Sequence, residues 1–137
     1  MAMDVAIEQV DGRTAVVSLT GELDASNFND LIETGRRLHD EGTRRVVLDL
    51  GGLLFLASSG LVALHSLVRI LRGEAPPDPE EGWGAIHSLE FDVSGGAAQS
   101  EVVLVNPTPA VDRVLERTGL KRLFQVYPDR AAALAEA

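Results

Sequence analysis

The sequence predicts one α/β domain: a mixed sheet of about five strands, partly parallel, with about four helices. Apolar runs of strand length alternate with amphipathic helical stretches along the chain, a pattern typical of such sheets. The 137 residues suffice for one core and are too few for two ordinary domains. Apolar residues make up 45% of the chain, which is enough to bury that core.

The composition excludes several classes of function. There are 21 acidic and 12 basic residues, a net charge of −9, so we expect no binding to nucleic acid, which needs a basic patch. The chain has no cysteine, which excludes disulfides, thiol catalysis and Cys-ligated zinc and fits a cytoplasmic protein. The first fifteen residues lack the basic region of a secretory signal. The most apolar stretch, 46–71, contains Asp49 and Arg69, so we expect no direct membrane insertion.

Two short strands and a helix are predicted at the N-terminus. The strands cover 4–10 and 13–20 and join at Asp11-Gly12, a pair that favours a tight turn. The helix ends near Asp40, and its inner face repeats at three- and four-residue spacing: Phe28, Leu31, Ile32, Gly35 and Leu38.

The ends of that helix also have sequence signals. Asp24 or Ser26 is expected to cap its first amides, because both residue types are favoured N-caps. Gly42 is expected to end it, since glycine accepts the left-handed conformation that follows many helices.

A third strand is predicted over 45–50, where a near-continuous apolar run is typical of a strand covered on both faces. Gly51-Gly52 is expected to open a loop, with 53–56 filling the interior. Ser58-Ser59-Gly60 then begins a helix that runs to about Arg72.

Residues 73–100 have a different composition and are predicted to be an acidic insertion, rich in glycine and proline, within the single domain 1–137. Within the insertion, 86–93 has the pattern of a strand. The only tryptophan, Trp83, is expected to pack within the molecule, as a large aromatic ring usually does.

The C-terminal part returns to regular structure. A strand is predicted at 101–105, followed by a helix with Thr108 as its cap and Pro109 as its first residue. A last strand at 123–127 and a short helix at 129–135 complete the chain.

The most informative feature is the pair of hydroxyls at the start of the 58–72 helix. A helix N-terminus stabilises anions, so the domain itself would tolerate a phosphoserine at Ser58. For a partner packed on that surface, an added charge of about −1.5 to −2 would be disruptive. The pattern therefore predicts a phosphorylation switch, and the alternative is that Ser58 or Ser59 simply caps the helix.

The same helix has two faces. Its apolar stripe is Leu61, Leu64, Val68 and Leu71. The remaining line is Ser58, Val62, His65, Arg69 and Arg72. We expect this line to be an exposed partner surface in an otherwise acidic protein; the alternative is an ordinary solvated face with arginines at the helix C-terminus.

Enzyme motifs are missing. Leu56 occupies the first glycine position of the Gly-x-Ser-x-Gly elbow around Ser58. His65 would lie about 10 Å along the helix from Ser58 at ~1.5 Å per residue, too far to act as its base. No histidine pair has metal-ligand spacing and no P-loop is present, so we expect no enzyme activity, cofactor or metal.

Four blocks carry a resemblance to a known family. They are 19–24, 46–50 with 55–61, 101–105 and 115–120. In these blocks and in their order, the chain resembles the STAS domain family, particularly the stand-alone anti-sigma factor antagonists of bacteria.

The resemblance implies a non-catalytic regulator. Members of that branch bind an anti-sigma factor that is itself a serine kinase. This binding frees the sigma factor that the kinase had held. The kinase inactivates them by phosphorylating the first serine of a pair, and a phosphatase restores them. By this resemblance, Ser58 is the phosphoacceptor and Asp24 the acidic residue near it. The implied partner-binding residues are Asp24, Ser58, Ser59, Gly60, Val62, His65, Arg69 and Arg72.

Two departures from the family support a second hypothesis. Ala57 stands where the family has an aspartate before the serine pair, and the insertion at 73–100 replaces a brief turn. These features favour an unphosphorylated scaffold or regulatory subunit, in a signalling assembly or in a lipid-transport ATP-binding cassette complex. The intact Ser58-Ser59-Gly60 and the stand-alone length favour the antagonist.

Overall fold

The fold is built on one five-stranded mixed sheet, which the computed structural model shows within the residues that it describes, 3–74 and 99–135. The strands are β1 (Met3–Gln9), β2 (Thr14–Leu23), β3 (Arg45–Leu56), β4 (Gln99–Val105) and β5 (Phe124–Tyr127), side by side in that order. β1 is antiparallel to β2, and every later pair is parallel. The predicted mixed α/β sheet is confirmed.

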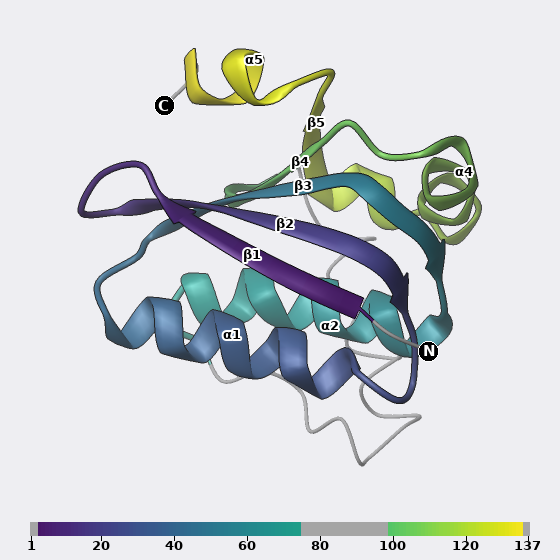
Figure 1. The fold of residues 1–137 in the computed structure, drawn as a ribbon, viewed down its shortest axis with the longest axis horizontal. Coiled ribbons are helices and arrows are strands. Elements are labelled where there is room, and N and C mark those ends of the chain that lie inside the picture. The colour runs from purple at the N-terminus through teal and green to yellow at the C-terminus, as the bar shows by residue number, and fades with distance from the viewer. Residues whose placement is uncertain (1–2, 75–98, 136–137) are drawn as a thin grey trace.

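Helices cover both faces of the sheet. They are α1 (Phe28–Asp40), α2 (Ser58–Leu71), α4 (Pro109–Thr118) and α5 (Arg130–Ala135), with a 3₁₀ helix at Leu120–Leu123. α1 and α2 lie alongside each other under one face, and α5 lies on the opposite face (Figure 1). The two helices approach closely, because Gly35 of α1 has no side chain where Leu67 of α2 packs.

The alternation along β3 divides the core into two parts. Val46 and Leu48 are fully buried with the apolar residues of α1, α2 and α4, whereas Val47 is buried with Ala133 of α5 on the other face. Successive side chains of a strand point to opposite faces, so a continuous apolar run requires cover on both. The prediction of a doubly covered central strand is therefore confirmed.

Arginine side chains attach α5 to its face of the sheet. The Arg130 guanidinium donates to one side chain on each of the first three strands: Ser18 (2.8 Å), Asp49 (3.2 Å) and Glu8 (3.3 Å). Arg45 donates from Nη2 to the carbonyl oxygen of Ala133 at 3.1 Å. Because the Arg130 side chain is 44% exposed, each of its ion pairs adds little stability alone.

β3 does not end where the sequence predicts. It continues through Gly51-Gly52 to Leu56, paired with the end of β2 in the register Gly21 to Leu53 and Leu23 to Leu56. A Cβ at Gly52 would lie 3.1 Å from the Leu19 carbonyl oxygen, so glycine permits the close pairing of the two strands. The predicted loop is therefore wrong.

The predicted interior position of residues 53–56 is half wrong. Leu53 and Leu56 are buried, but Leu54 is 67% exposed and Phe55 is 49% exposed. The β2–β3 register shifts between Gly21 and Glu22, and such an irregularity disturbs the strict alternation of sides that holds along a regular strand.

The predicted helix caps are also partly wrong. α1 has Asn27 at its N-cap, without a side-chain capping bond, and Asp24 instead accepts bonds from Ser26. α4 has Thr108 at its N-cap and Pro109 first, as predicted, but the Thr108 hydroxyl donates to the Leu53 carbonyl oxygen at 2.7 Å. The Asp24 side chain therefore stabilises the turn before α1, and the Thr108 side chain joins the start of α4 to β3.

Other predictions are confirmed or lie outside the described residues. α1 ends before Gly42, which has φ +106°, as expected of a glycine stop. β4 begins two residues earlier than predicted, and β5 and α5 lie where expected. The strand at 86–93 and the packing of Trp83 lie outside the described residues. Among the residues that the structure covers, we find no helix with the length and apolar character needed to span a membrane.

Candidate functional site

The predicted site lies where β2 and β3 end side by side. Leu23 and Leu56 are register partners, and the next backbone amide, that of Ala57, donates to the Leu23 carbonyl oxygen at 3.0 Å. Parallel strands bring their carboxyl ends to one edge of a sheet. The turn that carries Asp24 and the start of α2 at Ser58 therefore meet, although they are far apart in the sequence.

Ser58 is the first residue of α2 and is exposed. The N-cap is Ala57, in an extended conformation, so neither serine occupies the capping position. The interpretation of Ser58 as only a cap is therefore not what the structure shows. The first turn of α2 contains no acidic residue, so an anion on Ser58 would meet the positive end of the helix dipole without a like charge in that turn.

Asp24 keeps a negative charge at this edge. Its Oδ1 accepts from the Ser26 hydroxyl at 2.5 Å and from the Ser26 backbone amide at 2.9 Å. The hydroxyl bond, and then the amide bond, hold the pKa of the Asp24 carboxyl below its ordinary value. The carboxylate is therefore ionised at neutral pH and is held in the turn by Ser26.

Gly60 determines how closely α2 packs on the strand ends. It is buried, and a Cβ added there would lie 2.5 Å from Leu56 Cδ1 and 2.9 Å from Leu23 Cγ. Any larger residue would push the first turn of α2 outward. Gly60 therefore positions Ser58 rather than offering a surface of its own.

The rest of the predicted line along α2 is not a continuous exposed face. Val62 is 7% exposed and His65 is fully buried, so the expectation that both are exposed is wrong. The reason is that eleven residues of α2 are buried, as in a helix that is apolar around most of its circumference. Arg69 is half-buried, and Arg72 is exposed with its Nε 3.8 Å from Glu101.

Sequence reasoning missed two exposed apolar residues at this end of β3. Leu54 and Phe55 come just before Ser58 and are, with Ile7 and Val10, the exposed large apolar side chains of the described chain. Large contiguous apolar patches mark contact surfaces for other proteins, so this pair is a candidate for part of one. The uniform run 53–56 contained no signal that separates inward from outward residues, because that choice depends on the register with β2.

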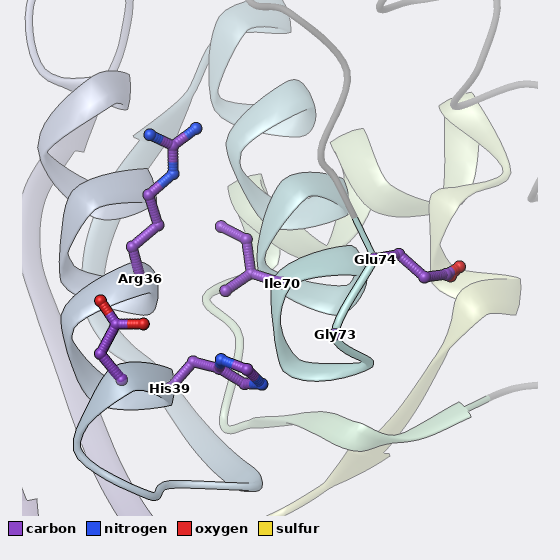
Figure 2. A pocket seen from close by; sticks show the side chains of 6 residues that line it. Arg36, His39, Ile70, Gly73 and Glu74 are labelled. Atoms are coloured by element: carbon purple, nitrogen blue, oxygen red, sulfur yellow. The ribbon is translucent and has the colours of Figure 1, made fainter.

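A separate hollow of about 220 Å³ lies between the C-terminal ends of α1 and α2. Figure 2 shows Arg36 and His39 on α1 opposite Ile70 of α2, with Gly73 just after the end of α2 and the Glu74 side chain extending away from α1. Within the described ranges, no group of three or more His, Asp or Glu side chains is placed to hold a metal ion. Because its lining mixes cationic and anionic side chains, we assign this hollow no role.

The fold and the serine at the strand–helix junction place the chain in a known class. Residues 7–75 match the family described as Mlab, STAS domain. This stretch contains the end of β1 and all of β2, α1, β3 and α2, and therefore the strand ends and the helix start that build the serine site. The chain belongs to the STAS domain family.

Relatives extend this likeness over nearly the whole chain. BtrV of Bordetella bronchiseptica, named as an anti-sigma factor antagonist, is 29% identical and the match covers 97% of this chain and 93% of BtrV. Unphosphorylated SpoIIAA, an anti-sigma factor antagonist, superposes with a TM-score of 0.69 at 19% identity, covering 97% and 95% of the two chains. An antagonist from Mycobacterium paratuberculosis gives 0.69 at 23% identity, covering 98% and 93%. Both structures share the fold.

Proposed function

We propose that this protein is an anti-sigma factor antagonist that binds an anti-sigma factor of the serine-kinase class and is switched off by phosphorylation of Ser58. The observation that carries the proposal is the position of Ser58, exposed as the first residue of α2 at the edge where β2 and β3 end. The likeness to BtrV along nearly the whole chain supports the same function.

The binding surface would be the set Asp24, Leu54, Phe55, Ser58 and Ser59, here called the serine surface. It combines exposed apolar side chains, an ionised carboxylate and hydroxyls. Burial of apolar area contributes about 25 cal/mol per Å², and aromatic side chains are enriched among residues that dominate binding energy. Phe55 is therefore the main candidate anchor, and Arg72, exposed at the far end of α2, would be a separate contact.

Phosphorylation would act on the partner rather than on the fold. In the transfer, Ser58 Oγ bonds to the γ-phosphorus of ATP, ADP leaves, and the hydroxyl proton passes to a base of the kinase. The new phosphate lies at the N-terminus of α2, where the dipole and the unpaired amides of the first turn stabilise it. Beside the apolar Leu54 and Phe55, the same charge would have to be desolvated when a partner binds, which disfavours the complex.

A second candidate function is an unphosphorylated STAS subunit of a signalling assembly or of a lipid-transport ATP-binding cassette complex. Ala57 favours it, because the residue before the serines lacks the carboxylate found in phosphorylated family members. In this case the serine surface would hold a permanent partner.

The deciding experiment is intact mass spectrometry after incubation with ATP and each candidate anti-sigma kinase from the same genome. We expect one added phosphate on the parent protein and none on Ser58→Ala, with Ser59→Ala as the matched control that is still modified. Ser58→Ala should still bind the kinase in a pull-down. Binding of no kinase would overturn the antagonist function, and binding without modification would overturn the switch and favour the second candidate.

A further inference from the structure

The first strand of the sheet pairs along one side only. β1 is at the end of the strand order, and within residues 3–74 and 99–135 its backbone bonds to β2 alone. Figure 1 shows it along the border of the sheet, above α1. Its seven residues keep one uninterrupted register with β2 and include no proline or bulge. Shortness, proline, bulges and charge are the usual protections of an edge strand, and β1 has only charge.

The bond pattern of the β1–β2 hairpin shows which backbone groups face outward. The Val10 amide donates to the Thr14 carbonyl oxygen at 2.9 Å, so these two residues form a bonded pair. Bonded and non-bonded pairs alternate along an antiparallel ladder, and the register continues unchanged from this pair along β1. The N–H and C=O groups of Val5, Ile7 and Gln9 therefore point away from β2. We call this side of the strand the β1 edge.

One face of β1 is apolar. Val5 and Ile7 are register partners of Leu19 and Val17, which belong to the core that α1 and α2 cover. Val5 is partly buried against that core, whereas Ile7 is 38% exposed. An apolar side chain on a neighbouring strand would therefore cover the remaining surface of Ile7.

The other face of β1, on the side of α5, is acidic. Asp4 and Glu8 both point there, because successive side chains of a strand alternate between faces. The Glu8 carboxylate is 3.3 Å from the Arg130 guanidinium, but its side chain is 68% exposed. Asp4 is exposed and takes part in no ion pair among the described residues. The β1 edge therefore has two accessible carboxylates on one face.

We propose that the β1 edge binds an extended segment of a partner protein in which apolar residues alternate with lysine or arginine. In this mode of recognition the main-chain bonds supply affinity, and alternate side chains supply specificity. The apolar residues would lie beside Ile7 and the cationic ones beside Asp4 and Glu8, where opposite charges on neighbouring strands are stabilising. β1 contributes no residue to the serine surface, so the proposal does not depend on the function proposed above.

A second copy of this chain fits the β1 edge less well than a cationic segment does. In a symmetric antiparallel pairing centred on Ala6, Asp4 of each copy would face Glu8 of the other. Like charges directly opposite each other destabilise a strand pair. The acidic face therefore acts against self-pairing and favours a partner of the opposite charge.

The probe is a heptapeptide of alternating lysine and valine with blocked ends, titrated by calorimetry and into the ¹⁵N-labelled full chain. We expect saturable binding to one site, with the largest amide shifts at residues 3–9. A peptide of the same composition with its valines adjacent cannot place all of them on one face, so it should bind at least roughly tenfold more weakly. A heptapeptide of alternating glutamate and valine should not bind.

Ile7→Pro tests the backbone pairing. Proline removes the outward amide of residue 7 and is tolerated on the solvent-facing side of an edge strand, so peptide binding should be lost in a folded protein. The amide spectrum checks that the fold is kept. Ile7→Ala is the matched control, because it retains the amide and should still bind, more weakly than the parent protein.

Asp4→Lys tests the charge without changing the backbone. It should weaken binding of the lysine–valine peptide by roughly threefold to tenfold, because an attraction between exposed charges becomes a repulsion. Asp40→Lys makes the same change at another exposed residue, at the end of α1, and should have much less effect.

Several results would overturn the proposal. The first is the absence of saturable binding, and the second is equal binding of the peptide whose valines are adjacent. Unchanged binding to Ile7→Pro would exclude backbone pairing, and equal effects of Asp4→Lys and Asp40→Lys would exclude a contact at Asp4. A concentration-dependent dimer in sedimentation velocity that Ile7→Pro abolishes would overturn it in favour of a second copy.

Discussion

The backbone amide of Ala57 donates a 3.0 Å hydrogen bond to the carbonyl oxygen of Leu23. This bond joins the end of β2 to the residue before α2 and sets where Ser58 lies relative to the Asp24 turn. Because only the backbone of residue 57 is used, the geometry does not require an aspartate at that position. The exposed serine is therefore kept in place in a chain that has alanine before it.

We predict that Ser58→Asp separates binding from stability. A carboxylate at the first residue of α2 interacts favourably with the helix dipole, so the free energy of unfolding should rise by about 0.3–1 kcal/mol. Binding to the anti-sigma factor should weaken by roughly tenfold or more, because a charged group must be desolvated in the interface. Urea unfolding and calorimetric titration measure the two effects, with the neutral Ser58→Asn as control. A variant that binds like its parent would contradict the switch.

Ala57→Asp should stabilise the helix and speed phosphorylation. Residue 57 is the N-cap of α2, and replacing alanine by aspartate at an N-cap adds about 0.5–2 kcal/mol to the free energy of unfolding. The carboxylate also supplies the aspartate that the resemblance to the anti-sigma factor antagonists leads us to expect before the serine pair. Urea unfolding and the initial rate of phosphate incorporation test both parts. An unchanged rate of phosphate incorporation would show that the kinase does not recognise the side chain of residue 57.

Phe55→Ser should weaken partner binding while sparing the fold. The Phe55 side chain is 49% exposed, so we expect the free energy of unfolding to change by no more than about 0.5 kcal/mol. The free energy of binding to the anti-sigma factor should weaken by more than about 1 kcal/mol, a loss that only a minority of interface residues cause when truncated. Val10→Ser, at a 45% exposed residue beside the β1–β2 turn, is the matched control. If the two variants lowered the affinity equally, Phe55 would not be part of the binding surface.

Gly60→Ala should destabilise the protein and displace Ser58. The new Cβ would lie 2.5 Å from Leu56 Cδ1, and overpacking of this kind costs about 1–3 kcal/mol. Thermal unfolding measures the loss. Gly12→Ala is the control, since nothing lies within 4 Å of a Cβ at Gly12. Similar melting temperatures for both variants would show that α2 is less tightly packed on the strand ends.

We predict that Asp24 contributes to the fall in stability at low pH and that Lys121 contributes to the fall at high pH. The bonds from Ser26 lower the pKa of Asp24 in the folded state, so its contribution is present above the unfolded-state pKa and is lost as pH falls through the folded value. Bonds to Asp112 and then Glu116 raise the pKa of Lys121, so its contribution is lost as pH rises through the folded value. When the free energy of unfolding is measured with urea at a series of pH values, Asp24→Asn should lessen its decrease at low pH. Lys121→Met should lessen its decrease at high pH. A variant with the same pH dependence as the parent protein would contradict the assignment for that residue.

Local patterns in the sequence were enough to predict most elements of the fold. The apolar run at 45–50 indicated a central strand, the spacing from Phe28 to Leu38 indicated α1, and the serine pair indicated the start of α2. These features depend on periodicity, turn residues and helix-start chemistry, which act over a few neighbouring residues. The family resemblance followed from the same blocks.

What only the tertiary structure decided depends on contacts between distant segments. The register of β2 against β3 carried β3 past Gly51-Gly52 and left Leu54 and Phe55 exposed. The packing of the whole fold buried His65, although its helical position had indicated an exposed face. The backbone bonds of Arg13 to Arg44 and Arg45 joined the β1–β2 turn to the start of β3. The burial of a residue depends on which distant segments pack against it. A local sequence pattern does not specify those segments.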